Sequence, residues 1–442
     1  MTRAGDLQTL LAYPGRATRA LVDLDALRHN ASALLSSLDH GTAMMAVVKA
    51  DGYGHGAVMV AREAVAAGAT WLGVATVAEG TELRDAGLST PTLILGPIDP
   101  SELDAATDAG LDVTVGQPDL VDALVDRSSW SATPIRLHVK VDTGMHRLGL
   151  SPADALSAID RLEASRPGSV YGLCTHLACA DDESSPLTAH QLATFDDVAS
   201  EARRVVPGIV CHVANSAGTL RGVGSSWSIA RVGIALYGCG VTGEQADRAG
   251  VRPAMSIVSR ILRVHDLRPG DAVSYGSTYV ASHRERVGLV PIGYADGYHR
   301  ALSNRGSMTV GERAYPVRGR VCMDQTIVGG LPEATSVGEW VGVVGPTLGG
   351  PGWGEVAEAA GTIDYELLTS VGRRVARLYH RSGRLVSTRD ERGRYLVVDD
   401  DNAPAVEQRP GRSRERVAST SRSTRAETGA SSPPPEGSRC PA

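Results

Sequence analysis

Lysine is nearly absent from this chain. The 442 residues include 44 basic residues, of which only Lys49 and Lys140 are lysines and the other 42 are arginines. Arginine can replace lysine as a solvated surface charge, but its guanidinium stays protonated and cannot readily act as an amine nucleophile. The two remaining lysines therefore direct attention to amine chemistry, with chance survival as the alternative.

Other features are missing too. No apolar run reaches the roughly 18 residues of a membrane span, and Pro14, Gly15 and Arg16 interrupt any signal-peptide core. The six cysteines form no CxxC pair, which favours reduced thiols in a cytoplasmic protein. The net charge of -6 excludes a whole-protein basic footprint for nucleic acid. We therefore expect a cytoplasmic location with neither a membrane nor a nucleic acid as partner.

The chain is long enough for two or three domains, and a hydrophobic content of 42% allows a sizeable core. Apolar, β-branched segments alternate with helical patterns at a mean spacing of roughly 27 residues, which is typical of a parallel (β/α)8 barrel. These segments are 44–49, 71–76, 92–95, 111–115, 135–141, 170–176, 208–213 and 230–236. An earlier strand at 19–24 has no place in an eight-stranded barrel and could pair with the next domain.

The pattern changes near residue 251. Short alternating strands separated by turn signals predict a β-rich domain over 251–400, with a helix near 362–380 and a last strand near 383–398. The barrel domain is expected over 1–250. Residues 401–442 are rich in Ser, Arg and Pro and are predicted to form a disordered tail.

Lys49 ends the first predicted barrel strand, in the stretch Val48-Lys49-Ala50-Asp51-Gly52. Functional groups of such barrels lie at the C-terminal ends of the strands. Burial beside apolar neighbours can lower the pKa of a lysine enough for amine chemistry. The alternative is a lysine that merely extends to solvent at the barrel rim.

The stretch AVVKADGYGHG around Lys49 resembles the pyridoxal-phosphate lysine motif of the alanine racemase family. The resemblance covers about residues 15–395, and its further motifs occur in the family's order. They are VKVDTGMHRLGL (139–150), THLACADD (175–182), HVANSAGTL (212–220), RVGIALYG (231–238), VSYGSTY (273–279), PIGYADGY (291–298), VCMDQ (321–325) and GTIDYE (361–366). It implies pyridoxal 5'-phosphate as cofactor, L- and D-alanine as substrates, and a supply of D-alanine for peptidoglycan synthesis.

Racemisation needs one base on each face of the substrate α-carbon. By the resemblance, Lys49 binds the cofactor and serves as one base, and Tyr275 serves as the other. A tyrosine with a pKa near ~10 needs assistance at neutral pH, and His176 matches the histidine that hydrogen-bonds it. Arg231 matches the residue that faces the pyridine nitrogen, where it keeps the ring a weak electron sink.

The resemblance also implies ligands for the cofactor phosphate and the substrate. Ser216 lies at an apparent strand-to-helix junction, where it could equally be a plain helix cap. The phosphate would be held by Ser216, the backbone donors of Gly233 and Ile234, and the hydroxyls of Tyr53 and Tyr365. The substrate would be bounded by Arg147, Met323, Asp324, Tyr294 and Tyr365.

Lys140 matches a lysine that is carbamylated in many members of the family, where the carbamate braces the arginine corresponding to Arg147. A free ammonium would repel that arginine. His146 departs from the smaller or uncharged residue expected beside Arg147. In the family, the segment with Tyr275 and Met323 reaches the barrel of the other subunit, so a homodimer with composite sites is implied.

Two rival enzymes and one metal site remain as alternatives. A decarboxylase on the same fold usually has an acidic residue where Arg231 stands, and a racemase of broader specificity would share the same residues. Cys174, His176 and Cys179 could suggest a metal ion, but no second ligand cluster accompanies them, so no metal is expected.

Overall fold

The computed structural model describes residues 4–127, 135–240 and 249–398. The predicted disordered tail at 401–442 lies outside the described residues. No described helix is both long and apolar enough to cross a membrane.

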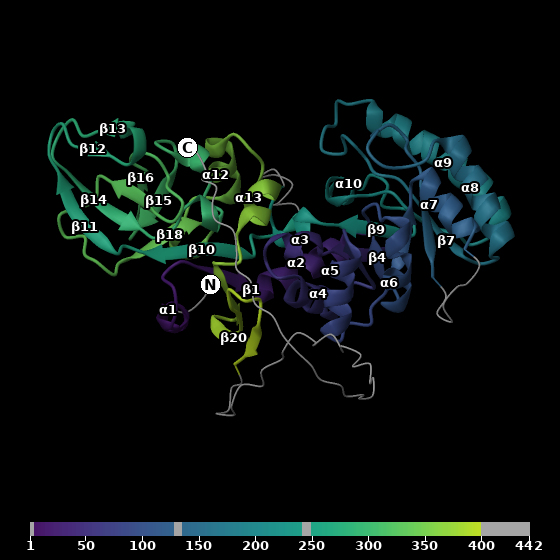
Figure 1. Cartoon of the computed structure of the whole chain (residues 1–442), viewed down its shortest axis with the longest axis horizontal. Helices are drawn as coiled ribbons and strands as arrows, with labels where there is room; N and C mark the ends of the chain where they lie inside the picture. The colour runs from purple at the N-terminus through teal and green to yellow at the C-terminus, as the bar shows by residue number, and fades with distance from the viewer. Residues whose placement is uncertain (1–3, 128–134, 241–248, 399–442) are drawn as a thin grey trace, which may run out of the picture. The chain divides into compact units, whose positions relative to one another are not determined.

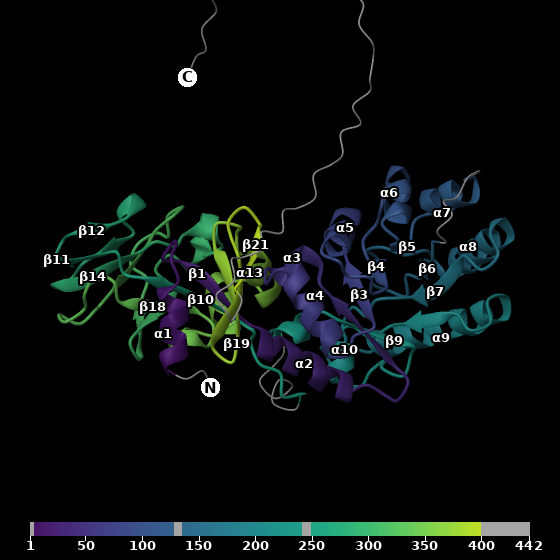
Figure 2. The ribbon, with the colours of Figure 1, turned by 90° about the horizontal axis from the view of Figure 1, so that it is seen from below.

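A closed ring of eight parallel strands confirms the predicted barrel, and the strands pair in chain order from β2 to β9. Helices α4 to α9 lie outside this ring (Figures 1 and 2). The strands are β2 (Ala43–Val47), β3 (Trp71–Val74), β4 (Thr92–Ile94), β5 (Asp112–Val115), β6 (Leu137–Lys140), β7 (Val170–Cys174), β8 (Val210–His212) and β9 (Ile229–Val232). Strands β3, β5 and β9 are buried along their whole length, as expected for a parallel sheet covered on both faces.

The barrel helices begin at the caps that their sequences provide. Thr76 accepts a hydrogen bond from the Glu79 N–H at the start of α5, and Ser151 does the same for Asp154 in α8, where Pro152 is the first helical residue. The barrel helices are α3 (Lys49–Tyr53), α4 (Ala57–Ala66), α5 (Val77–Asp85), α6 (Leu103–Asp108), α7 (Pro118–Val125), α8 (Pro152–Ser165), α9 (Leu187–Val205) and α10 (Ser216–Leu220), with the 3-10 turns η1 (Pro100–Glu102) and η2 (Ile234–Tyr237).

The second domain contains an eight-stranded sheet in the order β16-β15-β18-β10-β1-β19-β20-β21, a three-stranded sheet β11-β14-β17 and the pair β12-β13. Its strands are β10 (Met255–Arg260), β11 (Arg263–Leu267), β12 (Ala272–Val273), β13 (Tyr279–Val280), β14 (Glu285–Val290), β15 (Ser307–Val310), β16 (Arg313–Pro316), β17 (Thr326–Gly329), β18 (Trp340–Val344), β19 (Ala376–Arg381), β20 (Arg384–Arg389) and β21 (Tyr395–Val397). Its helices are α12 (Trp353–Ala360) and α13 (Asp364–Ser370), with the 3-10 turns η3 (Tyr275–Ser277), η4 (Tyr294–Asp296), η5 (Arg300–Leu302) and η6 (Thr347–Gly349).

The first strand of the chain lies in this second sheet. Strand β1 (Arg19–Asp23) pairs antiparallel with β10 and parallel with β19, with Leu21 opposite Ser256 and Leu378 (Figure 2). Helix α1 (Ala4–Ala12) precedes β1, and α2 (Leu24–Ser36) leads from it to the barrel. The chain therefore passes through the second domain before it forms the barrel.

The helix expected over 362–380 is wrong in its second half. Helix α13 ends at Ser370, and residues 376–381 form β19. Leu378 and Tyr379 are buried where β19 pairs with β1, so strand pairing decides the conformation there. The single last strand expected over 383–398 is two strands, β20 and β21. The domain boundaries at 250 and 400 stay predictions.

Candidate active site

Four basic side chains lie at or near the C-terminal ends of the barrel strands β2, β6, β7 and β9. Lys49 comes two residues after β2, Lys140 is the last residue of β6, His176 comes two residues after β7, and Arg231 belongs to β9. This is the C-terminal end of the barrel, where catalytic groups of such folds lie. Burial lowers the pKa of Lys49, and the charges of Arg147 and Arg231 lower it further against the opposing effect of Glu79. The amine of Lys49 is thus shifted toward its neutral, nucleophilic form.

Lys49 opens a left-handed turn. Ala50, Asp51 and Gly52 have φ values of 52°, 55° and 59°, and Tyr53 continues with 49°. Left-handed backbone costs a non-glycine residue roughly 1–2 kcal/mol. The turn is closed by hydrogen bonds from Gly52 N to Val48 O (2.8 Å) and from Gly54 N to Ala50 O (3.0 Å). The turn that begins at Lys49 is thus strained, and backbone hydrogen bonds hold it.

The Glu79 carboxylate supports the same turn from α5. Its Oε1 accepts a hydrogen bond from Ala50 N (2.7 Å), and its Oε2 accepts one from Ala75 N (2.6 Å). Glu79 therefore ties the residue after Lys49 to the end of the next strand, β3. The sequence analysis did not select Glu79.

The guanidinium of Arg231 is buried, with 6% of the residue exposed. Its Nη1 donates to His212 O (2.7 Å) and His212 Nδ1 (2.9 Å). Its Nη2 donates to Thr175 O (2.6 Å), Val213 O (3.0 Å) and His176 Nδ1 (3.2 Å). Both terminal nitrogens of Arg231 take part in these bonds. The Nε–H of Arg231 has no acceptor among the described residues. It is available to a ligand inside the barrel mouth.

Arg231 also fixes the tautomers of two histidines. A guanidinium can only donate, so Nδ1 of His176 and Nδ1 of His212 must both accept and their protons lie on Nε2. Burial lowers the pKa of His176 to about 2, and the charge of Arg231 adds to this. His176 is therefore a neutral imidazole with its Nε2–H available as a donor. His212 in turn determines the tautomer of His138, because the Nε2–H of His212 donates to His138 Nδ1 (2.9 Å).

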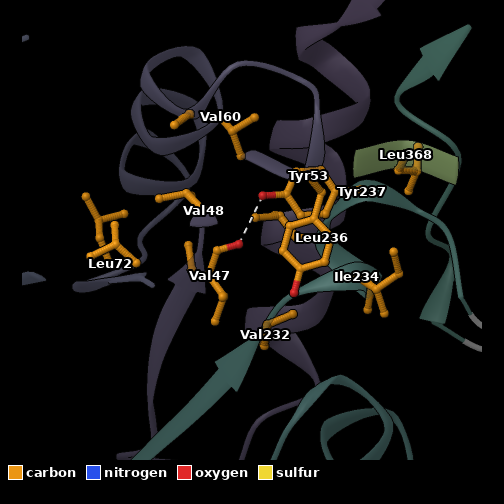
Figure 3. Packing of buried hydrophobic residues seen from close by; sticks show 14 of the residues in the cluster. Val47, Val48, Tyr53, Val60, Leu72, Val232, Ile234, Leu236, Tyr237 and Leu368 are labelled. Carbon is orange, nitrogen blue, oxygen red and sulfur yellow. Dashed lines mark hydrogen bonds between the residues drawn. The ribbon is translucent and has the colours of Figure 1, made fainter. Parts of the chain in front are cut away.

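The side-chain oxygens of Ser216 and Tyr53 both lie close to the backbone of Gly233. Asn215 caps α10, and Ser216 Oγ accepts a hydrogen bond from Gly233 N (2.9 Å). A Cβ on Gly233 would lie 2.6 Å from the Tyr53 hydroxyl oxygen, so only glycine allows the hydroxyl this close. The N–H of Ile234 begins the turn η2 and has no acceptor within that turn. Figure 3 shows the Tyr53 hydroxyl directed toward the segment that carries Ile234.

The ring of Tyr53 is held on both sides. It packs on Tyr237 with 4.7 Å between ring centroids, and the Tyr237 hydroxyl donates to Val47 O (3.0 Å), which is the dashed line in Figure 3. Tyr365 lies on its other side at 6.2 Å. Tyr365 comes from α13 of the second domain, and the neighbouring Asp364 accepts a hydrogen bond from Gly240 N (2.9 Å). Helix α13 therefore borders the barrel mouth.

Arg147 and Lys140 lie near each other without a bond between them in the described part of the chain. Burial lowers the pKa of Lys140, and Arg231, Arg147 and Lys49 lower it further, against the opposing effect of Cys174. His146 has a φ of 53° and turns to Asp142, with 3.4 Å between Nδ1 and Oδ2.

The remaining predicted residues form a separate group in the second domain. Tyr294 N donates to Cys322 O (3.1 Å) and Ala295 N donates to Met323 O (3.0 Å), so their two loops are joined. Met323 is 52% exposed and Tyr275 is 74% exposed.

Tyr275 and Asp324 complete the group. Ser274, beside Tyr275, donates to Arg320 O (2.8 Å). Asp324 forms an ion pair with Arg374 (2.7 Å), so its carboxylate is engaged within the domain. No hydrogen bond, ion pair or ring contact in residues 4–127, 135–240 and 249–398 joins Tyr275 to the barrel.

No group of His, Cys, Asp and Glu in the described residues could hold a metal ion. The five cysteines of that part of the chain are free.

Sequence reasoning missed His212 and His138, the partners that order Arg231. A usable signal was present, because His138 alternates with Lys140 along β6 and His212 ends β8.

Two family models match the chain in order. The model "Alanine racemase, N-terminal domain" matches residues 22–240, and "Alanine racemase, C-terminal domain" matches residues 254–379. The alanine racemase of Thermobifida fusca is 40% identical over 367 residues, covering 81% of this chain and 97% of that protein. That of Mycobacterium avium is 38% identical over 379 residues, covering 84% and 96%.

Solved structures agree. Alanine racemase from Clostridium difficile matches with a TM-score of 0.80 at 30% identity, covering 86% of this chain and all of that one. The enzyme from Bacillus anthracis, solved with bound L-Ala-P, matches with a TM-score of 0.79 at 33% identity, covering 85% and 98%.

Proposed function

The chain belongs to the alanine racemase family and interconverts L-alanine and D-alanine, and we propose how the residues at its barrel mouth carry out this reaction. The named relatives are all alanine racemases, so the comparisons do not favour the decarboxylase alternative. The observation that carries the mechanism is that Lys49 follows β2 and Arg231 lies on the paired strand β9 at the same end of the barrel, where burial lowers the pKa of Lys49.

The residues present fit pyridoxal 5'-phosphate. Ser216, the N–H of Ile234 and the Tyr53 hydroxyl form a small cradle for the phosphate, which a Cβ on Gly233 would fill. Tyr365 borders the same cradle, and Arg231 Nε–H would face the pyridine nitrogen. Lys49 would hold the cofactor covalently. What the cofactor supplies when bound is an electron-accepting ring that stabilises negative charge on the substrate α-carbon.

Arg231 limits how strongly that ring accepts electrons. A guanidinium donates a hydrogen bond and does not give up its proton, so it leaves the ring nitrogen unprotonated. The five hydrogen bonds that Arg231 donates keep its guanidinium plane in one orientation. A weak electron sink suits proton exchange at one carbon and disfavours side reactions.

Lys49 moves the α-proton on one face of the substrate, and the partner subunit's Tyr275 moves it on the other. The exposure of Tyr275 and Met323 supports a homodimer in which each second domain completes the other barrel's site. Within the described residues, no hydrogen bond, ion pair or ring contact joins Tyr275 to the barrel of its own chain, which agrees with this arrangement. The neutral His176 would offer its Nε2–H to the incoming tyrosine oxygen and stabilise its deprotonated form.

Arg147 would bind the substrate carboxylate, with Met323 and Tyr294 of the partner subunit bounding the pocket. Asp324 would contribute through its backbone, because Arg374 occupies its side chain. We propose that Lys140 is carbamylated, since the lowered pKa favours the neutral amine that reacts with carbon dioxide. The carbamate would then attract Arg147.

The product D-alanine would supply peptidoglycan synthesis in the cytoplasm. The test is side-by-side racemisation of alanine, serine and lysine by the cofactor-loaded protein, followed by chiral chromatography, with Lys49→Ala as the blank. Alanine should be the fastest substrate, because a pocket bounded by Tyr365 and Tyr294 suits a methyl side chain. Equal or faster turnover of serine or lysine would instead identify a racemase of broader specificity.

A further inference from the structure

The hairpin formed by β20 and β21 contacts the strained turn that begins at Lys49. Arg389, the last residue of β20, forms an ion pair with Asp51 in the middle of that turn. The family's C-terminal model ends at residue 379, before this hairpin. We propose that Arg389, acting through Asp51, is a positioning residue that holds Lys49 in its reactive direction; this rests on the proposed role of Lys49.

The arginine of this ion pair is shielded from water, whereas the Asp51 side chain is 31% exposed. Arg389 is 7% exposed, its guanidinium lies 5.3 Å from the centroid of the Tyr395 ring, and its Nη2 lies 3.8 Å from a Glu82 carboxylate oxygen. An ion pair with one buried partner is screened less by salt than a pair between two fully exposed side chains.

Asp51 connects three parts of the fold. Its Oδ2 pairs with Arg389, its Oδ1 accepts a hydrogen bond from Ala57 N (3.2 Å) at the start of α4, and its own backbone is left-handed. Strained backbone persists only where the surroundings determine it. Loss of the carboxylate or of the guanidinium should therefore let the turn relax toward ordinary φ values.

Strand β19 of the second domain contacts the C-terminal end of this turn, at Gly54 and Gly56. Arg377 donates twice to Gly54 O, at 2.9 and 3.1 Å. A Cβ on Gly56 would lie 2.0 Å from the Tyr379 hydroxyl oxygen and 3.2 Å from that of Tyr395. Asp51 lies only two residues from Lys49, so the ion pair with Arg389 acts on the part of the turn near Lys49.

A matched control exists on the adjoining strand. Arg381 ends β19 and pairs with Glu63 of α4 (2.6 Å) and Asp25 of α2 (3.5 Å). It joins the same sheet to the barrel through ion pairs, but it does not touch residues 49–56 in the described structure. Arg381→Met therefore reports the general cost of losing an ion pair between the domains.

The experiment compares cofactor-loaded wild type with Arg389→Met, Asp51→Asn, the double variant and Arg381→Met. Amides of residues 50–56 should exchange with deuterium roughly tenfold faster in Arg389→Met and Asp51→Asn, but not in Arg381→Met. The kcat for alanine should fall about tenfold with KM within about twofold, and the double variant should be no worse than either single one. Arg389→Lys should restore part of kcat.

Unchanged exchange in both Arg389→Met and Asp51→Asn, or losses no larger than those of Arg381→Met at equal melting temperature, would overturn the proposal. Asp51→Asn preserves the shape of the side chain and gives the answer if Arg389→Met does not fold. Wild-type racemisation in the same assay tests the proposed function separately, because the exchange measurement does not depend on turnover.

Discussion

Arg231 donates a hydrogen bond from Nη2 to Nδ1 of His176 across 3.2 Å, and this bond determines which form of the histidine is present. Protonation at Nδ1 would place two cations in contact inside a buried site. His176 is thus a hydrogen-bond donor of fixed tautomer rather than a proton carrier. The resemblance to a known family identified both residues, but the direction of the bond comes from the structure.

We expect His176 to stay neutral from pH 8 to pH 4, because burial and then Arg231 lower its pKa to about 2. Nitrogen NMR of ring-labelled protein should show an unprotonated Nδ1 and a protonated Nε2 throughout that range. His176→Gln identifies the signal by its absence. Titration of His176 between pH 5 and pH 8 would contradict both the tautomer and the role given to Arg231.

Lys49→Arg should abolish both activity and the visible absorbance of bound cofactor, since a guanidinium cannot replace the amine. Borohydride reduction gives a second measurement. Lys140 is the only other lysine, so peptide mapping of the reduced protein distinguishes the two positions. The labelled peptide should contain Lys49; label on Lys140 would mean that the cofactor site has been assigned to the wrong lysine.

Tyr275→Phe should impair proton exchange on one face of the substrate far more than on the other. Loss of a single general base costs at least about 100-fold. The measurement is deuterium incorporation from solvent into L- and D-alanine separately. Equal losses for both enantiomers in a normally folded protein would count against the assignment of Tyr275 to one face.

Lys49→Ala and Tyr275→Ala should complement each other when mixed. If each second domain serves the partner's barrel, a mixed dimer has one site with both changes and one intact site. Random exchange makes half of the dimers mixed, so about a quarter of wild-type activity should return. Exchange is verified with two differently tagged chains. Absence of activity after verified exchange would place Tyr275 in the site of its own chain.

His55 should make the protein less stable in mild acid. It is fully buried, its pKa is lowered by burial to about 4, and its Nδ1–H donates to Tyr53 O (2.9 Å). The unfolded chain binds a proton near pH 6.5 and the folded chain does not. Stability therefore falls between pH 6.5 and about 4, by up to about 1.4 kcal/mol per pH unit.

His55→Asn keeps a donor toward Tyr53 O and removes this titration. Thermal unfolding of loaded protein from pH 7 to pH 5 should therefore show a shallower decline for His55→Asn than for wild type. Parallel curves would show that His55 binds its proton equally well in the folded and unfolded chains.

The barrel could be predicted because each of its strands is a short apolar run followed by a helical pattern, at near-constant spacing. Strand β17 was not predicted, because Thr326–Gly329 directly follows the VCMDQ motif and is only four residues long. The boundary between α13 and β19 depends on pairing with residues 19–23, more than 350 positions away in the chain. The sequence indicated that the strand at 19–24 could pair with the second domain, but not that residues 376–381 would form its partner strand.

Motifs selected the candidate site residues, but they did not indicate which residues hold them in place. The supporting residues hold a neighbouring residue in place, and they are Glu79, His212 and Arg389. Such a role can be recognised only from the interatomic distances in the structure. The left-handed turn after Lys49 was not predicted either. Its glycines suggested a close approach to a ligand, but the residue types of Ala50 and Asp51 did not indicate positive φ.

The position of β1 has a consequence for how the protein is made. Residues 19–23 leave the ribosome roughly 230 residues before β10, and β19 follows later still. The barrel can assemble during synthesis. The sheet of the second domain cannot form until β10 and β19 have been made, because they pair with β1 on its two sides. Strand β1 therefore reaches its final place only after β10 and β19 have been made. A fusion partner placed directly before Arg19 would disturb the second domain first, although it is attached at the barrel's end of the sequence.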